Sequence, residues 1–148
     1  MSNDPFELER FVTAQAGDYQ RALEEIRAGR KRSHWIWYIL PQLAGLGSSP
    51  RSQHFGIKSL AEARAYLGHP VLGPRLREVA QAALEVEGRT AHEIFGSPDD
   101  LKLRSCATLF AAVVPGDSVF QRLLDRYFAG EPDPRTVRLI TDDNRTAG

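Results

Sequence analysis

Cysteine is almost absent from this chain of 148 residues, since Cys106 is the single one. One cysteine cannot form an internal disulfide or a multi-cysteine metal cluster. The four histidines also lack the spacing of a metal motif such as HExxH. The sequence therefore predicts a protein without a disulfide framework or a metal centre, and no motif in it indicates a cofactor.

Long apolar runs and an excess of one charge are missing as well. No stretch approaches the ~18 apolar residues of a membrane span, and the N-terminus lacks the basic and apolar regions of a signal peptide. The formal net charge is +0, whereas dedicated nucleic-acid-binding proteins usually carry a basic excess. These absences predict a cytoplasmic protein with no membrane partner, and they argue against nucleic acid as the partner.

Strong strand signals are scarce too, and helix signals take their place. Capping residues precede apolar positions at helical spacing, with Ser59, Thr90 and Ser97 as expected caps. We expect an all-α, single compact domain of about seven or eight short helices over residues 1–140. A polar tail at 141–148 is expected to be flexible.

Three local expectations bear on the middle of the chain. Residues 35–40 are short, aromatic and followed by a proline, which favours a short buried helix or turn. The composition of 44–52, rich in glycine and serine, predicts a loop. Further on, Leu101 is expected on the inner face of the helix that Ser97 caps.

The stretch KRSHWIWYILPQLAGLGSSPRSQHFGI, residues 31–57, gathers the residue types of a binding site. It supplies cations for phosphate or carboxylate, flat faces for stacking, glycines that admit a ligand to the backbone, and hydroxyl and amide groups. Its candidate ligand-binding residues are Lys31, Arg32, Trp35, Trp37, Gln42, Gly45, Gly47, Ser49, Arg51 and Ser52. His34 is the candidate catalytic acid or base, because an imidazole exchanges protons near neutral pH.

A second segment, DLKLRSCATLF at 100–110, contains Arg104 and Ser105 as further candidate ligand-binding residues. They complete the pocket if His34, Arg51, Ser52 and Arg104 converge on one cavity. The simpler alternative makes Arg104 a surface cation and Ser105 a small packing residue. Cys106 lies among apolar residues and is expected to be an inert core thiol.

Simpler explanations exist for the first segment as well. Trp35 is typical of a core residue, and the basic run at 30–32 is typical of a solvated helix end. The run GLGSS lacks the spacing of a phosphate-binding loop. The functional interpretation therefore rests on the coincidence of these groups in one stretch.

Three segments carry a resemblance to a known family: AGRKRSHWIWYILPQLAGLGSSPRSQHFGI, DLKLRSCATLF and LLDRYFAGEPDPRTVRLI. The chain resembles the domain of unknown function 1810 family from Asp4 to Ile140, most specifically over 34–47. The resemblance implies a small, mostly helical fold and no established activity, so it assigns no catalytic residue. The positions that match the family's pattern are Lys31, His34, Trp35, Pro41, Gln42, Gly45, Gly47, Ser49, Ser52, Lys102, Arg104, Ser105, Asp133 and Thr136.

Together these observations predict a protein that binds an anionic small molecule, either phosphate-bearing or nucleotide-like. Hydrolase or transferase chemistry stays open, with Asp133 as a conceivable partner of His34 if the chain folds back. The alternative is a single-stranded nucleic-acid-binding or protein-interaction module with no catalysis, since aromatic residues among cations also suit single strands. The ligand and the oligomeric state do not follow from the residues.

Overall fold

The computed structural model describes residues 4–147, apart from the side chains of 143–147, and this part of the chain contains ten helices and no sheet. Seven of the ten helices have seven residues or more, which confirms the all-α expectation. The helices are α1 (Glu9–Gln15), α2 (Tyr19–Arg27), α3 (Ile36–Ile39), α4 (Pro50–Phe55), α5 (Leu60–Gly68), α6 (Leu72–Glu85), α7 (Ala91–Phe95), α8 (Asp99–Ala111), α9 (Val119–Phe128) and α10 (Pro134–Ala147).

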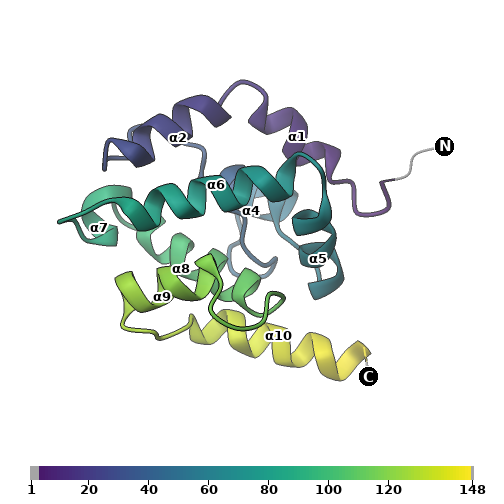
Figure 1. The fold of residues 1–148 in the computed structure, drawn as a ribbon. Helices are drawn as coiled ribbons and strands as arrows, with labels where there is room; N and C mark the ends of the chain where they lie inside the picture. The colour runs from purple at the N-terminus through teal and green to yellow at the C-terminus, as the bar shows by residue number, and fades with distance from the viewer. Residues whose placement is uncertain (1–3, 148) are drawn as a thin grey trace.

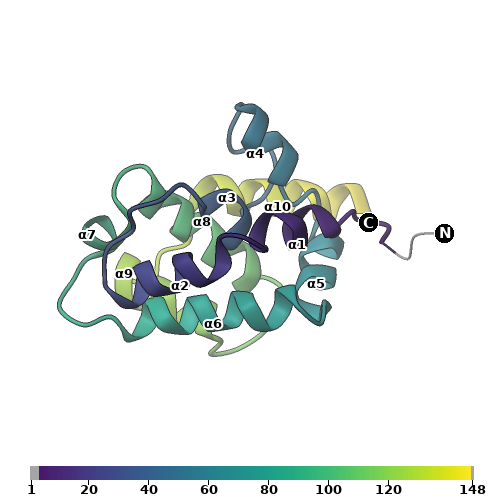
Figure 2. The ribbon, with the colours of Figure 1, turned by 90° about the horizontal axis from the view of Figure 1, so that it is seen from above.

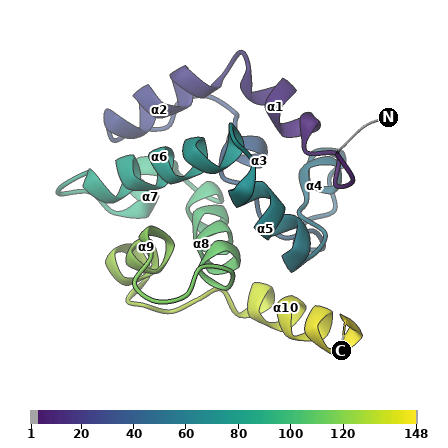
Figure 3. The same cartoon turned by 45° about the vertical axis from the view of Figure 1, so that its right-hand side comes forward.

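Helix α8 lies at the centre of the arrangement and contacts α5, α7, α9 and α10. Helix α6 packs between α2 on one side and α9 on the other (Figure 1). In Figure 3, α8 passes between α9 and α5, and α10 extends from its lower end. The short helix α4 projects from the body of the molecule (Figure 2). The loops on either side of α4 are joined by an isolated parallel bridge between Leu43 and Ile57.

A chain of aromatic contacts links the helices through the core. The ring centroids of Phe11 and Tyr66 are 5.1 Å apart, those of Tyr66 and Phe110 are 5.6 Å apart, and those of Phe110 and Phe120 are 5.5 Å apart. All four side chains are buried. Tilted and edge-on aromatic pairs add to the free energy of apolar burial, so these residues connect α1, α5, α8 and α9 into one core.

Capping interactions confirm two of the helix starts expected from the sequence. The hydroxyl of Ser59 accepts a hydrogen bond from the backbone N–H of Glu62 at the start of α5. At α7, Thr90 and Glu93 form a complete capping box, with each side chain accepting from the other residue's backbone N–H. Such interactions are local, which is why the sequence predicts them well.

Three expectations are corrected by the structure. The expected loop over 44–52 ends earlier, because Ser49 caps α4 and Pro50 occupies its first position, where a missing N–H costs nothing. Helix α8 begins after Pro98, so Ser97 is not its cap. Leu101 lies on the outer side of α8 and is 56% exposed.

The segment 141–148, expected as a tail, is occupied by α10 up to Ala147. Gly148 lies outside the described residues. The flexibility of this segment stays a prediction.

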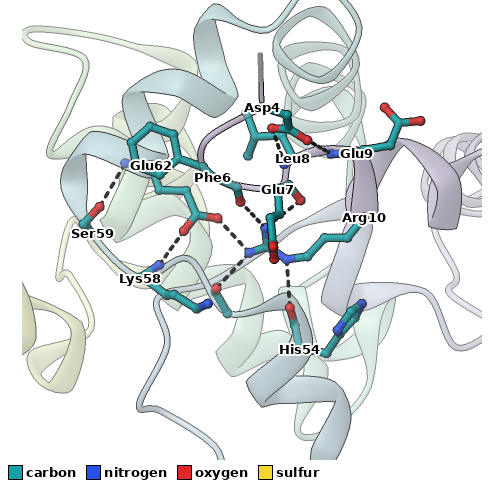
Figure 4. Close-up of polar contacts among 11 residues, drawn as sticks. Asp4, Phe6, Glu7, Leu8, Glu9, Arg10, His54, Lys58, Ser59 and Glu62 are labelled. Atoms are coloured by element: carbon teal, nitrogen blue, oxygen red, sulfur yellow. Dashed lines mark hydrogen bonds and ion pairs between the residues drawn. The ribbon is translucent and has the colours of Figure 1, made fainter. Parts of the chain in front are cut away.

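Arg10 fastens the N-terminal segment to α4 and α5 (Figure 4). Its Nη2 lies 2.7 Å from the Oε2 of Glu62 and also donates to the backbone oxygen of Gly56 at 3.1 Å. Its Nε donates to the backbone oxygen of His54 at 2.8 Å. Its Nη1 donates to the backbone oxygens of Phe6 and Glu7. One guanidinium thus satisfies acceptors from three separate parts of the chain, in a mostly buried setting.

Candidate ligand-binding cleft

A cleft opens between α3 with its following loop, the first two turns of α8, and the start of α10. Its volume is about 380 Å³, at the small end of the range of about 300–1,000 Å³ for ligand pockets. It is lined by Trp37, Gln42, Leu46, Gly47, Pro98, Leu101, Lys102, Arg104, Ser105, Asp133 and Arg135. Five of these were candidate ligand-binding residues in the sequence, namely Trp37, Gln42, Gly47, Arg104 and Ser105.

Lys102 lies against Trp37 and belongs to a group of charges with Asp99 and Lys31. Its Nζ lies 4.2 Å from the centroid of the indole and 3.1 Å from Oδ1 of Asp99. The Oδ2 of the same carboxylate lies 2.7 Å from Nζ of Lys31, whose side chain is only 6% exposed. Burial acts to raise the pKa of Asp99, but the hydrogen bonds and charges of the two lysines outweigh it and lower that pKa. Lys31 therefore compensates Asp99, and the group keeps a net positive charge beside the cleft.

Two arginines add to the positive charge of the lining. Nε of Arg104 donates to the backbone oxygen of Glu131 at 3.0 Å. Arg135 is exposed and has no ion-pair partner among the described residues. The carboxylate of Asp133 accepts from the backbone N–H and the hydroxyl of Thr136, at 2.9 and 2.5 Å. The carboxylate of Glu131 also lies 3.7 Å from Nη2 of Arg104 and partly compensates its charge. The described lining itself has three cations and one carboxylate that already caps α10, which favours an anionic ligand.

The remaining lining combines apolar and neutral polar groups. Leu101 presents an exposed apolar side chain, and its backbone oxygen accepts from the hydroxyl of Ser105 at 3.1 Å. Gly47 lies close to the first turn of α4, because a Cβ there would be 3.0 Å from both Cβ and Oγ of Ser52. The amide of Gln42 completes this part, and the residue is 8% exposed.

The expected convergence of His34, Arg51, Ser52 and Arg104 on one cavity is not found. Arg104 lines the cleft, but His34 and Arg51 are exposed outside its lining. Arg32 is exposed outside it as well and lines a separate shallow hollow on α2. The physical reason is that Arg32 is fixed beside α2, where its backbone N–H donates to Glu25, and that Arg51 lies on α4, which projects from the body of the molecule.

Two serines and a glycine of the predicted set have local structural roles. The hydroxyl of Ser49 accepts from the backbone N–H of Ser52, and the hydroxyl of Ser52 donates to the backbone oxygen of Ser49, at 3.1 and 2.8 Å. Gly45 has a left-handed backbone, with φ of +98°, and lies beside Leu139 of α10. None of these three residues lines the cleft.

Trp35 is a core residue, 1% exposed, and belongs to a different polar cluster. Its Nε1 donates to the Oε1 of Glu25 at 2.9 Å, and this carboxylate also accepts from the backbone of Arg32 and from the backbone and hydroxyl of Ser33. Desolvation acts to raise the pKa of Glu25, but these donors outweigh it and lower the pKa to about 2. The anion held by this basic segment is therefore a carboxylate of the chain itself.

Three lining residues of α8 and the proline before it were not recognised as one surface in the sequence. Pro98, Leu101, Lys102 and Ser105 follow the spacing i, i+3, i+4, i+7 and therefore share one side of the helix. That spacing was a usable signal. Arg135 lies in the first turn of α10, and no local pattern connects it to α3 or α8.

Other chemistry-bearing groups lie apart from the cleft. Cys106 is 1% exposed, and burial raises the pKa of its thiol, in agreement with an inert core thiol. The described residues contain no group of three or more His, Cys, Asp or Glu side chains able to hold a metal ion. No helix in the described part of the chain combines the length and the apolar character needed to cross a bilayer.

Comparisons with known proteins agree with the fold and with the resemblance seen in the sequence. No curated protein matches the chain. The crystal structure of the conserved hypothetical protein Rv1873 from Mycobacterium tuberculosis is 54% identical in sequence, with a TM-score of 0.92 over 93% of this chain and 99% of that one. The model of the protein of unknown function family DUF1810 matches residues 5–140. The chain therefore belongs to the DUF1810 family.

Proposed function

We propose that the protein binds a small, phosphate-bearing anion in the cleft between α3, α8 and α10. The observation that carries the proposal is the meeting of Lys102, Arg104 and Arg135, from two helices, in one lining. Asp99 is shared between Lys102 and Lys31, and Glu131 lies 3.7 Å from Arg104, so these carboxylates compensate the cations only in part. Arg135 has no ion-pair partner among the described residues, and an anion in the cleft would compensate the remaining positive charge. The planar donor forks of the two arginines suit the oxygens of phosphate.

The proposal concerns binding, and it does not extend to hydrolysis or transfer. A general acid or base has to reach the reacting group, but His34 is exposed outside the lining. The carboxylate of Asp133 accepts two hydrogen bonds from Thr136 as the cap of α10. The cleft thus offers groups that hold negative charge rather than an unoccupied proton acceptor.

Titration calorimetry with ribose 5-phosphate tests the proposal. We expect saturable binding by the wild-type protein, and a ligand at 100 times its Kd should stabilise the fold by about 2.7 kcal/mol. The Arg135→Gln variant should lose about 10- to 100-fold in affinity, because charge-assisted hydrogen bonds contribute about 1.5–3 kcal/mol. Arg135 is exposed and has no ion-pair partner in the described part of the chain, so this variant should keep its thermal stability.

Arg138→Gln is the matched control, since Arg138 is an exposed arginine of α10 that does not line the cleft. It should leave the affinity unchanged. Absence of saturable binding, or equal losses in the two variants, would contradict the proposal. Preferential binding of a single-stranded oligonucleotide, weakening steeply with salt, would instead support the nucleic-acid alternative.

A further inference from the structure

Gln42 differs from the other buried polar side chains of the protein. Among the described residues, the buried polar or charged residues are Gln15, Gln42, Ser52, Glu62, Ser105, Thr108 and Thr136. Six of these seven side chains form hydrogen bonds within the protein. The side-chain amide of Gln42 has no partner in the part of the chain that the structure describes.

The other buried glutamine shows what a structural amide does in this fold. The Nε2 of Gln15 donates to the backbone oxygen of Tyr38 at 2.8 Å and to the hydroxyl of Tyr66 at 3.1 Å. Its Oε1 accepts from Nη1 of Arg75 at 3.3 Å. Gln15 therefore uses both ends of its amide inside the core, whereas neither end of the Gln42 amide has a partner in the described part of the chain.

The unpartnered amide of Gln42 faces the cleft. No side-chain nitrogen or oxygen in the described residues is both sealed from solvent and unpaired, so the polar atoms of Gln42 must reach open space. Gln42 is 8% exposed and lines the cleft, which leaves the cleft as that space. An amide fixed in a mostly buried position without a protein partner is a group kept for a ligand or for water.

We infer that the ligand of the cleft is a nucleoside monophosphate, and that Gln42 recognises the edge of its base. The inference rests on the proposed phosphate binding and adds the organic part of the ligand. A carboxamide offers an acceptor beside two donors in one plane, and it pairs with base edges that present a donor beside an acceptor. An adenine edge is the best-known partner of a glutamine.

The neighbours of Gln42 fit a planar heterocycle. Trp37, Leu46 and Leu101 supply flat or apolar walls in the same lining, and the 56% exposed side chain of Leu101 would be covered by a base. The cations of α8 and α10 that line the cleft would bind the phosphate of the same ligand. The volume of about 380 Å³ suits a single nucleotide-sized ligand.

Calorimetry with ribose 5-phosphate and with the 5′-monophosphates of adenosine, guanosine, cytidine and uridine tests the inference. Wild-type protein should bind at least one nucleotide about 10- to 100-fold more tightly than ribose 5-phosphate, because one bidentate amide pair discriminates by this factor. Gln42→Met keeps the length of the side chain and removes the amide. It should bind that nucleotide about 10- to 100-fold more weakly than the wild type does, with the affinity for ribose 5-phosphate unchanged.

The possible results distinguish base recognition by Gln42 from the phosphate binding on which it rests. If ribose 5-phosphate binds as tightly as every nucleotide, the base-recognition inference is overturned and phosphate binding stands. If no probe binds, phosphate binding itself fails. Gln81→Met, an exposed glutamine on α6, is the control and should keep the discrimination. Because the amide of Gln42 has no partner among the described residues, Gln42→Met should also keep the thermal midpoint. If this variant is destabilised, the wild-type affinities for the nucleotides and for ribose 5-phosphate still test the inference.

Discussion

The buried ion pair between Arg10 and Glu62 allows a quantitative test of what holds the N-terminal segment (Figure 4). The side chains are 10% and 2% exposed, and their nearest atoms are 2.7 Å apart. An Arg10→Met substitution keeps much of the aliphatic volume. Among the described residues, the backbone N–H of Lys58 is then the remaining hydrogen-bond donor to the Glu62 carboxylate, at 3.0 Å. The substitution also removes the donors to His54 and Gly56.

The expected loss of stability follows from that geometry. Removing one partner of a buried pair costs about 3–5 kcal/mol, because the other charge stays buried without compensation. An exposed pair contributes only about 0.2–1 kcal/mol. The double variant Arg10→Met with Glu62→Leu leaves no buried charge, so it should be less destabilised than Arg10→Met alone.

Urea unfolding followed by circular dichroism measures the effect. With a slope of about 2 kcal/mol per M, a loss of about 4 kcal/mol lowers the midpoint by about 2 M. Arg122→Gln is the control, since its ion pair with Asp117 is 3.1 Å long but 54% and 70% exposed. If Arg10→Met costs no more than Arg122→Gln, the buried pair does not hold the segment and the reasoning is refuted.

Two further predictions concern charges near the first tryptophan. Because the folded-state pKa of Glu25 is about 2, below its ordinary value of 4.5, the ionised carboxylate stabilises the fold above that ordinary value, and its contribution is lost as the pH falls toward 2. Urea midpoints of the wild type should therefore decrease more steeply between pH 5 and 3 than those of Glu25→Gln. If the midpoints of the two proteins fall in parallel with pH, the hydrogen bonds to the Glu25 carboxylate do not stabilise its ionised form. Lys31→Met should weaken the binding of ribose 5-phosphate although Lys31 does not line the cleft, because Asp99 would then neutralise Lys102. Lys31→Arg should restore the affinity, and an unchanged affinity in Lys31→Met would show that the compensation has no effect on the cleft.

Much of the helical architecture could be predicted from the sequence because its signals are local. The capping box of Thr90 and Glu93 depends on residues three positions apart, and it is present in the structure as expected. The start of α4 was missed although Ser49 and Pro50 form a common cap and first position. Glycine and serine around them made the composition typical of a loop.

The two tryptophans show why the candidate site was only partly predictable. Residues two apart share a face in a strand but lie on nearly opposite sides of a helix. The periodicity of 35–40 does not distinguish a strand from a helix. The sequence therefore does not show whether Trp35 and Trp37 lie on the same side of this segment or on opposite sides. In the structure Trp35 immediately precedes α3 and donates a hydrogen bond to Glu25, whereas Trp37 lies within α3 and lines the cleft.

By itself, the sequence determined the all-α fold, the family resemblance and the segments that carry the polar and aromatic groups. These features depend on residue spacing and on motifs that are recognised within short segments of the sequence. The tertiary structure alone decided which cations meet, since it buried Lys31 against Asp99 and brought Arg135 of α10 beside Lys102 of α8. That choice depends on how helices distant in the chain pack against each other, and no local pattern records it.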